Sequence, residues 1–370
     1  MKPYTIALKL KNSGYPIVIG YDFFKDIPQY LRKLSLAPTV PSGLGKDAVV
    51  ISHALIERLH GARLSVALSK AGYTAKFFNV PQGEKSKSAS CALKVIEKIS
   101  AYDVNRKIFI IALGGGVIGD LSGFVAAIYK RGIPYIQIPT TLLAQIDSAI
   151  GGKTAIDLKY GKNLVGAFYQ PKAVFADTKV LATLTPRQIR NGLAEAIKYG
   201  VIRDPVLFGF LEKKHASILQ NDHQSITFVV KRCARIKADV VASDERETKG
   251  IRTILNFGHT AGHAIEAASN FRYHHGEAVA LGMRVAARIS ALKGMLNAKD
   301  EARLNNLITS IGLPEKIQNT SLSKIMALMR HDKKFVAGRN RFVLACGIGE
   351  VKVVEGVPTK IITQAIQSIF

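Results

Sequence analysis

The chain has 370 residues, 48% of them hydrophobic and 21% charged, which is typical of a globular protein too long for one ordinary core, so two domains are expected. Its three cysteines, Cys91, Cys233 and Cys346, form no CxxC pair, which disfavours a disulfide framework and a cysteine zinc site and favours a reducing cytoplasm. Lysine and arginine outnumber the acids by 52 to 27, an excess that attracts anionic partners.

The first half of the chain alternates apolar runs with amphipathic stretches. TIALKL and YPIVIG flank an Asn12-Ser13-Gly14 turn and predict a β-hairpin. Further strand candidates are the β-rich runs at 48–52, 65–68, 76–80, 107–113, 135–139 and 173–177. Helical patterns such as ALKVIEKISAY lie between several of them. This alternation predicts an α/β N-terminal domain, residues 1–180, with a mostly parallel, Rossmann-like sheet.

From residue 181 onward, helical spacing predominates. The helical segments are PRQIRNGLAEAIKYGVI, DPVLFGFLEKKHASIL, TFVVKRCARIKADVVASDE, GHTAGHAIEAAS, GEAVALGMRVAARISALKG and KDEARLNNLITSIG. One short strand candidate, RFVLAC, lies at 341–346. Apart from this strand, we expect residues 181–370 to form an all-α C-terminal domain.

Two classes of partner are disfavoured. The start, MKPYTIALKL, has no signal-peptide pattern, and the apolar stretch 108–129 contains Asp120 and five glycines, which fits a buried strand and helix better than a membrane span. The basic residues are scattered and accompany no nucleic-acid motif. We therefore expect a cytoplasmic protein that binds neither membrane nor nucleic acid.

The stretch KIFIIALGGGVIGDLSGFVAAIY reads as a strand, a glycine turn and a helix. Gly114, Gly116 and Gly119 satisfy GxGxxG, and such a turn lets a helix N-terminus approach a diphosphate. The acid expected about twenty residues on is absent, because that position falls in IPTTLL. The turn is therefore either a dinucleotide site outside the standard first βαβ unit or a turn needed only for close packing.

A second glycine motif, GGKT at 151–154, resembles the end of a Walker A loop. Asp147 occupies the position of its first glycine, so a nucleotide triphosphatase is rejected. What remains is Lys153, followed by Lys162 and Asn163 in YGKNLVG. These side chains suit an anion, although lysines beside turns are also common on plain surfaces.

Four of the nine histidines lie between residues 259 and 275. His259 and His263 are four apart in a helical pattern and form the obvious first candidate for a metal pair, while His274 and His275 follow a helix break. An upstream helix carries Glu195 and Lys198 one turn apart. Two histidines and one carboxylate can form a catalytic zinc site. The spacing favours metal binding without selecting the ligands.

Together these motifs resemble the 3-dehydroquinate synthase family of the sugar-phosphate cyclase superfamily. The matching blocks run in order from residue 81 to 334: PQGEKSK, GGGVIGDLSGFVAAIYKRG, QIPTTLLAQIDSAIGGKTAID, GKNLVGAFYQP, NGLAEAIKYG, KADVVASDE, LNFGHTAGHAIE, HHGEAVALGM and HDKK. The combination is far more specific than any single block.

The resemblance implies a carbon–oxygen lyase that uses NAD as a recycled oxidant and one Zn²⁺ or Co²⁺ per chain. The implied substrate is 3-deoxy-D-arabino-heptulosonate 7-phosphate, and the products are 3-dehydroquinate and phosphate. The implied steps are transient oxidation by NAD, phosphate elimination, re-reduction and intramolecular aldol closure, in the shikimate pathway towards aromatic amino acids. The family also implies a homodimer.

The resemblance further implies roles for individual residues. The metal ligands would be Glu195, His259 and His275. The NAD contacts would be Glu84, Lys87, Gly114, Gly115, Gly116, Gly119, Asp120, Thr140, Thr141, Lys153, Lys162 and Thr183. The substrate pocket would contain Asp147, Lys153, Lys162, Asn163, Lys198, Lys237, Arg252, Asn256, His263 and either Lys333 or Lys334 of HDKK. Arg131 is similar to an arginine that family members lend across a dimer interface, and His274 is left without a role.

Two enzyme classes compete with this interpretation. Another sugar-phosphate cyclase would act on a different sugar phosphate through a partly changed pocket. A metal-dependent polyol dehydrogenase would share the glycine turn and a helical metal domain, but it would release NADH at each turnover and need no phosphate-binding lysines.

Overall fold

The computed structural model describes residues 3–11, 14–35, 44–330 and 340–370. The chain forms two compact units, one from residues 1–184 and 226–246 and the other from residues 185–225 and 247–370. Helix α8 (His223–Ser243) lies almost wholly in the first unit, whereas the sequence assigns this helix to the C-terminal domain. Each unit is described by itself below.

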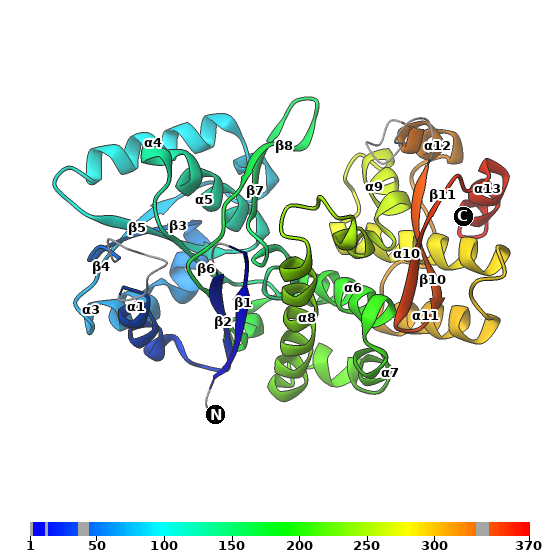
Figure 1. Ribbon diagram of the computed structural model, residues 1–370, viewed down its shortest axis with the longest axis horizontal. Helices are drawn as coiled ribbons and strands as arrows, with labels where there is room; N and C mark the ends of the chain where they lie inside the picture. The colour runs from blue at the N-terminus through cyan, green and yellow to red at the C-terminus, as the bar shows by residue number, and fades with distance from the viewer. Residues whose placement is uncertain (1–2, 12–13, 36–43, 331–339) are drawn as a thin grey trace. The chain divides into compact units, whose positions relative to one another are not determined.

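The first unit is built on a seven-stranded sheet in the order β1-β2-β9-β6-β5-β3-β4 (Figure 1). The strands are β1 (Tyr4–Lys9), β2 (Gly14–Gly20), β3 (Asp47–Ser52), β4 (Thr74–Asn79), β5 (Ile108–Gly114), β6 (Tyr135–Pro139) and β9 (Val174–Asp177). Only β1 is antiparallel to its neighbour. The mostly parallel sheet and the β1–β2 hairpin are as predicted, while Asn12 and Ser13 of the predicted turn lie outside the described residues.

Helices connect these strands. They are α1 (Ile27–Ser35), α2 (Ala54–Ile56), α3 (Ala62–Ser69), α4 (Ala89–Tyr102) and α5 (Gly116–Ile128), with a π-helical turn, η2, at Glu57–Gly61. The strand predicted at 65–68 is wrong, because these residues belong to α3. Leu64 and Leu68 are buried while Val66 is 55% exposed, which is helical rather than strand periodicity. A short apolar run alone cannot distinguish the two.

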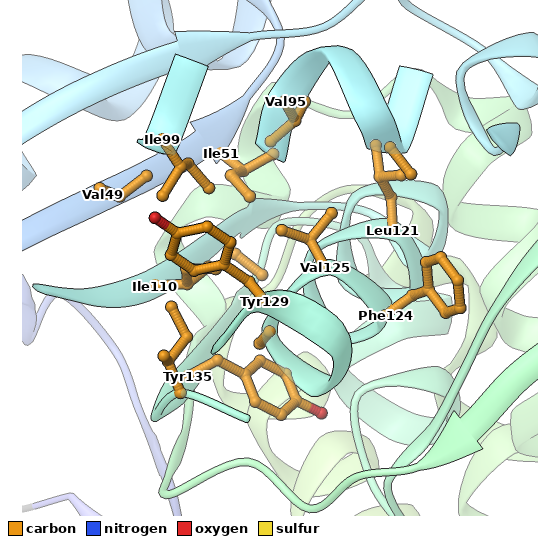
Figure 2. Packing of buried hydrophobic residues seen from close by; sticks show 14 of the residues in the cluster. Val49, Ile51, Val95, Ile99, Ile110, Leu121, Phe124, Val125, Tyr129 and Tyr135 are labelled. Carbon is orange, nitrogen blue, oxygen red and sulfur yellow. The ribbon is translucent and has the colours of Figure 1, made fainter. Parts of the chain in front are cut away.

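One hydrophobic cluster of this unit lies between β3, β5, β6, α4 and α5. Val49, Val95, Ile110 and Val125 are among its buried members, and Figure 2 shows side chains from these strands and helices packed together. All of β5 is buried, as expected of a central parallel strand covered on both faces. The chain goes from β3 outward to β4 and then returns to β5 on the other side of β3, so the strand order reverses between β3 and β5. Such a reversal is where open α/β sheets bind ligands, beyond the carboxyl ends of the strands.

A second hairpin, β7 (Lys153–Leu158) and β8 (Gly161–Phe168), extends away from the main sheet (Figure 1). The sequence does not predict it, because β8 is exposed or half-buried throughout and carries no inward-facing periodicity. The remaining short turns of the unit are η1 (Phe24–Asp26), η3 (Glu84–Ser86), η4 (Tyr129–Arg131), η5 (Ala144–Ser148) and η6 (Thr178–Thr183).

The second unit is mostly helical, as predicted. Its helices are α6 (Pro186–Arg203), α7 (Pro205–Leu219), α9 (His259–Ala268), α10 (His275–Leu292), α11 (Ala298–Ile311), α12 (Leu322–Arg330) and α13 (Thr359–Gln367), with the turn η7 at Ile251–Asn256. It is not strictly all-α: the predicted strand at 341–346 is β10 (Arg341–Gly347), which pairs antiparallel with β11 (Glu350–Glu355). The apolar inner residues of β10 are buried.

Glycines set how closely three of these helices approach. A Cβ on Gly282 of α10 would lie 1.9 Å from the carbonyl oxygen of Gly258, just before α9, and 2.6 Å from the nitrogen of Gly262. A Cβ on Gly276 would lie 2.1 Å from the carbonyl oxygen of Asn191 in α6. No side chain fits at either contact, so glycine alone allows α10 to pack against the backbones of both α9 and α6.

Candidate functional site

Glu195, His259 and His275 come together in the second unit from three helices, α6, α9 and α10. One potential ligand atom from each lies within 4.8 Å of the other two. The Nε2 atoms of His259 and His275 lie 3.5 and 3.3 Å from Oε1 of Glu195. The close glycine contacts of α10 explain this arrangement, because they bring the start of α10 beside α6 and α9. These three residues can hold one divalent cation.

The carboxylate of Glu195 is fully buried. The Lys198 ammonium, one turn later on α6, forms an ion pair with Oε2, while Oε1 faces the two imidazoles. Burying a carboxylate is unfavourable unless partners compensate its lost hydration. A cation between Glu195 and the two imidazoles would supply such compensation, so the donor set fits a metal.

The neighbouring acids set the protonation of His275. Burial lowers the pKa of this imidazole, but the Glu195 and Glu266 carboxylates favour its protonated, hydrogen-donating form, outweigh burial and raise the pKa to about 9. The site therefore attracts positive charge, whether as a proton or as a metal ion.

The other two histidines occupy different positions. The ring centroid of His263 lies 5.2 Å from that of His259 and 5.9 Å from that of His275, but His263 is not part of the group whose ligand atoms converge. His274 precedes α10, where its backbone nitrogen donates to the Glu277 carboxylate at 2.8 Å. Helical spacing alone thus favours a pair, His259 and His263, that differs from the pair whose nitrogens approach Glu195.

In the first unit, the glycine turn joins β5 to α5. Gly115 precedes the helix, and a Cβ on Gly114 would lie 2.6 Å from the Ile118 side chain. A Cβ on Gly119 would lie 2.8 Å from the side chain of Gln137 on β6. The start of α5 is therefore packed tightly on the strand ends, at the edge of the sheet where the strand order reverses. A helix N-terminus in this place suits a diphosphate.

Lys87 connects three segments beside this turn. Its Nζ lies 2.6 Å from Oδ2 of Asp120 on α5 and also donates to Oδ1 of Asn163 on β8. Burial raises the pKa of Asp120 to about 6, although the Lys87 charge and hydrogen bond partly counteract it. Lys162, next to Asn163, has its Nζ 3.9 Å from Glu84. Cofactor and substrate candidates are therefore interleaved in this unit.

The candidate threonines fall into two groups. Thr140 donates its backbone N–H to Gly114 at 2.9 Å, and its buried hydroxyl has no hydrogen-bond partner among the described residues. A Cβ on Gly115 would lie 3.0 Å from Thr141, so both of these threonines flank the glycine turn. Thr183 instead lies on η6, where its hydroxyl contacts His60 Nε2 at 3.3 Å.

The remaining candidates of the first unit are spread over four segments, η4, η5, β7 and α8. Asp147 on η5 forms an ion pair with Lys237 on α8, while Lys153 is exposed at the start of β7. Arg131 is exposed. Lys130 and Arg131 both have left-handed backbones, with φ of 48° and 63°. Two adjacent non-glycine residues in this conformation are strained.

In the second unit, Lys198 and Arg252 are 1% and 2% exposed. Nε of Arg252 lies 3.4 Å from the Glu247 carboxylate, and Asn256 ends η7 shortly before His259. Lys333 lies outside the described residues. The sequence interpretation assigns no role to Glu247, Glu266 or His60. Only Glu266 has a usable signal, because it follows His259 by seven residues and so shares its helical face.

Comparison with known proteins gives one family. Residues 77–191 match the model of the 3-dehydroquinate synthase N-terminal domain, and residues 192–335 match that of its C-terminal domain. The chain is 43% identical over 355 residues to the 3-dehydroquinate synthase of Desulforamulus reducens, covering 95% of this chain and 96% of that protein.

Solved structures of two sugar-phosphate cyclases are also similar. One is 2-deoxy-scyllo-inosose synthase complexed with carbaglucose-6-phosphate, NAD⁺ and Co²⁺, with a TM-score of 0.86, 27% identity and coverage of 99% of this chain and 100% of that one. The other is 2-epi-5-epi-valiolone synthase from Streptomyces hygroscopicus subsp. jinggangensis with NAD⁺ and Zn²⁺ bound, with a TM-score of 0.85, 25% identity and coverage of 98% of each chain. Among the described residues, no helix is both long and apolar enough to cross a membrane. The two adjoining domain models and the near full-length relative establish that the chain belongs to the 3-dehydroquinate synthase family.

Proposed function

We propose that this chain converts 3-deoxy-D-arabino-heptulosonate 7-phosphate into 3-dehydroquinate and phosphate, as a carbon–oxygen lyase that depends on NAD and one divalent metal ion. The observation that carries the proposal is the convergence of Glu195, His259 and His275 in a chain that also has the glycine turn. A metal site and a dinucleotide site in one chain are what a reaction with an internal oxidation and reduction requires.

NAD is proposed to bind at the glycine turn. The N-terminus of α5 and the flanking Thr140 and Thr141 would face its diphosphate. The buried Thr140 hydroxyl, which has no hydrogen-bond partner in the described part of the chain, would be a polar group for this ligand. Lys87 and Asp120 would fix the edge of this site through their ion pair. Both similar cyclase structures contain NAD⁺, which supports this assignment.

The metal is proposed to be held by Glu195, His259 and His275, with Zn²⁺ or Co²⁺ as candidates because those ions are bound in the two cyclases. When bound, the ion would act as a Lewis acid towards a substrate oxygen. The ligands themselves would exclude competing cations by their two nitrogen donors, which favour transition metals over Mg²⁺ and Ca²⁺.

The substrate is proposed to be held by lysine, arginine, asparagine and histidine side chains. The candidates are Asp147, Lys153, Lys162, Asn163, Lys198, Lys237, Arg252, Asn256 and His263. Cationic side chains match a phosphate and a carboxylate by charge-assisted hydrogen bonds. Holding one substrate conformer would favour both phosphate elimination and ring closure.

A homodimer is proposed through the β7–β8 hairpin. Its exposed apolar side chains include Leu158, Val165 and Phe168, and Tyr160 at its tip is 88% exposed, an arrangement typical of an interface. The hairpin ends beside Arg131, since the Tyr169 hydroxyl donates to the Ile133 carbonyl at 2.8 Å. Analytical ultracentrifugation should find a dimer for the wild type and a larger monomer fraction for Tyr160→Ser; unchanged association would remove the hairpin from the interface.

One assay tests the reaction. Purified protein is incubated with the heptulosonate phosphate, substoichiometric NAD and Zn²⁺, and phosphate, dehydroquinate and NADH are measured. We expect phosphate and dehydroquinate in equal amounts over many turnovers per NAD, with no NADH accumulating. Absence of phosphate release would refute the proposal.

The same assay distinguishes the second candidate, a cyclase for another sugar phosphate, which the likeness to 2-deoxy-scyllo-inosose synthase favours. Phosphate release from a different sugar phosphate, with none from the heptulosonate phosphate, would select that alternative. Net NADH formation from a polyol would instead select a dehydrogenase.

A further inference from the structure

The two imidazoles that face Glu195 are oriented in the same way. His259 directs Nε2 towards Glu195, while its Nδ1 lies 3.1 Å from the carbonyl oxygen of Phe257. His275 also directs Nε2 towards Glu195, and its Nδ1 lies 3.7 Å from Oε2 of Glu266. Each ring therefore has one nitrogen aimed at the carboxylate and the other facing an oxygen acceptor.

Helix packing and hydrogen bonds fix the backbone of Glu266. It lies on α9, one side of the close α9–α10 contact, and its side chain is only 10% exposed. Its backbone carbonyl accepts hydrogen bonds from the nitrogen of Phe271 and the hydroxyl of Ser269, both at 2.9 Å, where α9 ends. The Glu266 carboxylate thus approaches His275 from a fixed backbone.

The chemistry of imidazole ligands gives this contact a consequence. A neutral imidazole binds a metal through one nitrogen only when its proton is on the other. An acceptor at Nδ1 holds the proton there, orients the ring and increases the basicity of Nε2, and losing such an acceptor typically weakens metal binding 10–100-fold. For His259 the Phe257 carbonyl lies at Nδ1, and for His275 the Glu266 carboxylate lies there.

We propose that Glu266 is a positioning residue that fixes His275 as a metal ligand through Nδ1. This inference rests on the proposed metal site and adds a residue that the ligand set does not contain. A purely structural ion pair between α9 and α10 would make a different prediction, since it would stabilise the fold without changing the affinity or geometry of the metal.

The test measures metal binding without catalysis. Metal-free full-length protein is titrated with Zn²⁺ in competition with a chromophoric chelator. We expect Glu266→Ala to raise the Zn²⁺ dissociation constant about 10–100-fold, and Glu266→Gln, which keeps an acceptor and the side-chain shape, to raise it less. Loading with Co²⁺ should show a changed visible absorption spectrum for Glu266→Ala.

Glu301→Gln is the matched control. Glu301 is a partly buried carboxylate of the same unit that lies 3.7 Å from a different cation, Arg288, so its loss removes the same charge elsewhere. We expect its Zn²⁺ affinity to stay within about twofold of wild type, because that charge does not contact a ligand.

The outcomes separate the inference from the proposed function. A wild-type protein that binds no Zn²⁺ would refute the metal site itself. If the wild type binds Zn²⁺ and Glu266→Ala binds it equally well with the same Co²⁺ spectrum, only the role of Glu266 is refuted. If Glu266→Ala does not fold, Glu266→Gln decides: an affinity equal to that of Glu301→Gln at an unchanged melting temperature overturns the inference.

Discussion

The glycine turn and the histidine site differ in how they are built. The turn is one continuous segment, from β5 through Gly114–Gly116 into α5, and its neighbours Thr140 and Thr141 follow the adjacent strand. The histidine site takes one residue from each of α6, α9 and α10, with Glu195 and His275 eighty positions apart in sequence. A local motif is visible in the sequence as a pattern, whereas an assembled site depends on how helices pack.

The difference extends to electrostatics. At the turn, Asp120 already has a cationic partner in Lys87. At the histidine site, Glu195 is contacted by Lys198 and two imidazoles and is fully buried. We therefore expect the turn to tolerate single substitutions better than the histidine site, where each residue depends on the other two.

The largest expected effect is the difference between two substitutions, His275→Ala and His263→Ala. His275→Ala removes a proposed ligand, so bound metal and activity should be lost together, with a fall of roughly 10³-fold or more in kcat because metal catalysis is worth several kcal/mol. His263→Ala should retain the metal and lose turnover. Metal content by atomic spectroscopy and steady-state kinetics on both variants check this.

The opposite pattern, with metal lost from His263→Ala and kept by His275→Ala, would overturn the ligand assignment. The metal would then be bound by the helically spaced pair, His259 and His263, and the site would be a local sequence motif like the glycine turn.

A second prediction tests whether the histidine site depends on helix packing. Gly282→Ala would place a Cβ 1.9 Å from the Gly258 carbonyl oxygen, so α9 and α10 must move apart. We expect it to destabilise the protein by about 2–4 kcal/mol, at least as much as ordinary overpacking, and to weaken Zn²⁺ binding. Urea unfolding and Zn²⁺ titration measure both effects.

Gly209→Ala is the matched control, because Gly209 lies within α7 and its added Cβ would meet nothing within 4 Å. It should stabilise the protein by about 0.5–1 kcal/mol through helix propensity and leave Zn²⁺ affinity unchanged. Equal destabilisation by both substitutions would mean that the close contact at Gly282 does not define the site.

The same contrast explains what the sequence predicts and what it does not. The parallel sheet follows from apolar runs such as β5 alternating with helical patterns, and the helices of the second unit follow from their spacing. The 65–68 strand is wrong because four residues cannot distinguish helix from strand, and β7–β8 is missed because it buries no continuous face. Residue types alone leave the metal ligands open, since the approach of His275 to Glu195 depends on backbone contacts at Gly276 and Gly282.

The smallest expected effect concerns Asp120 at the turn. Replacing it should raise the relative stability of the protein as the pH rises, and it should weaken NAD binding. Its pKa is raised from 3.8 to about 6, so between these values the folded protein holds a proton that the unfolded chain has released. The stability contributed by this protonation is complete below pH 4 and is lost as the pH rises through 6. Asp120→Asn stays neutral, so its free energy of unfolding relative to wild type should increase by about 1–3 kcal/mol between pH 4 and 7.

NAD should bind more weakly to the Asp120→Asn variant, because Lys87 loses the carboxylate that holds it. Chemical denaturation across this pH range and NAD titration measure the two effects; a pH-independent difference in stability would show that Asp120 ionises normally, and the ion pair with Lys87 would then fully offset its burial.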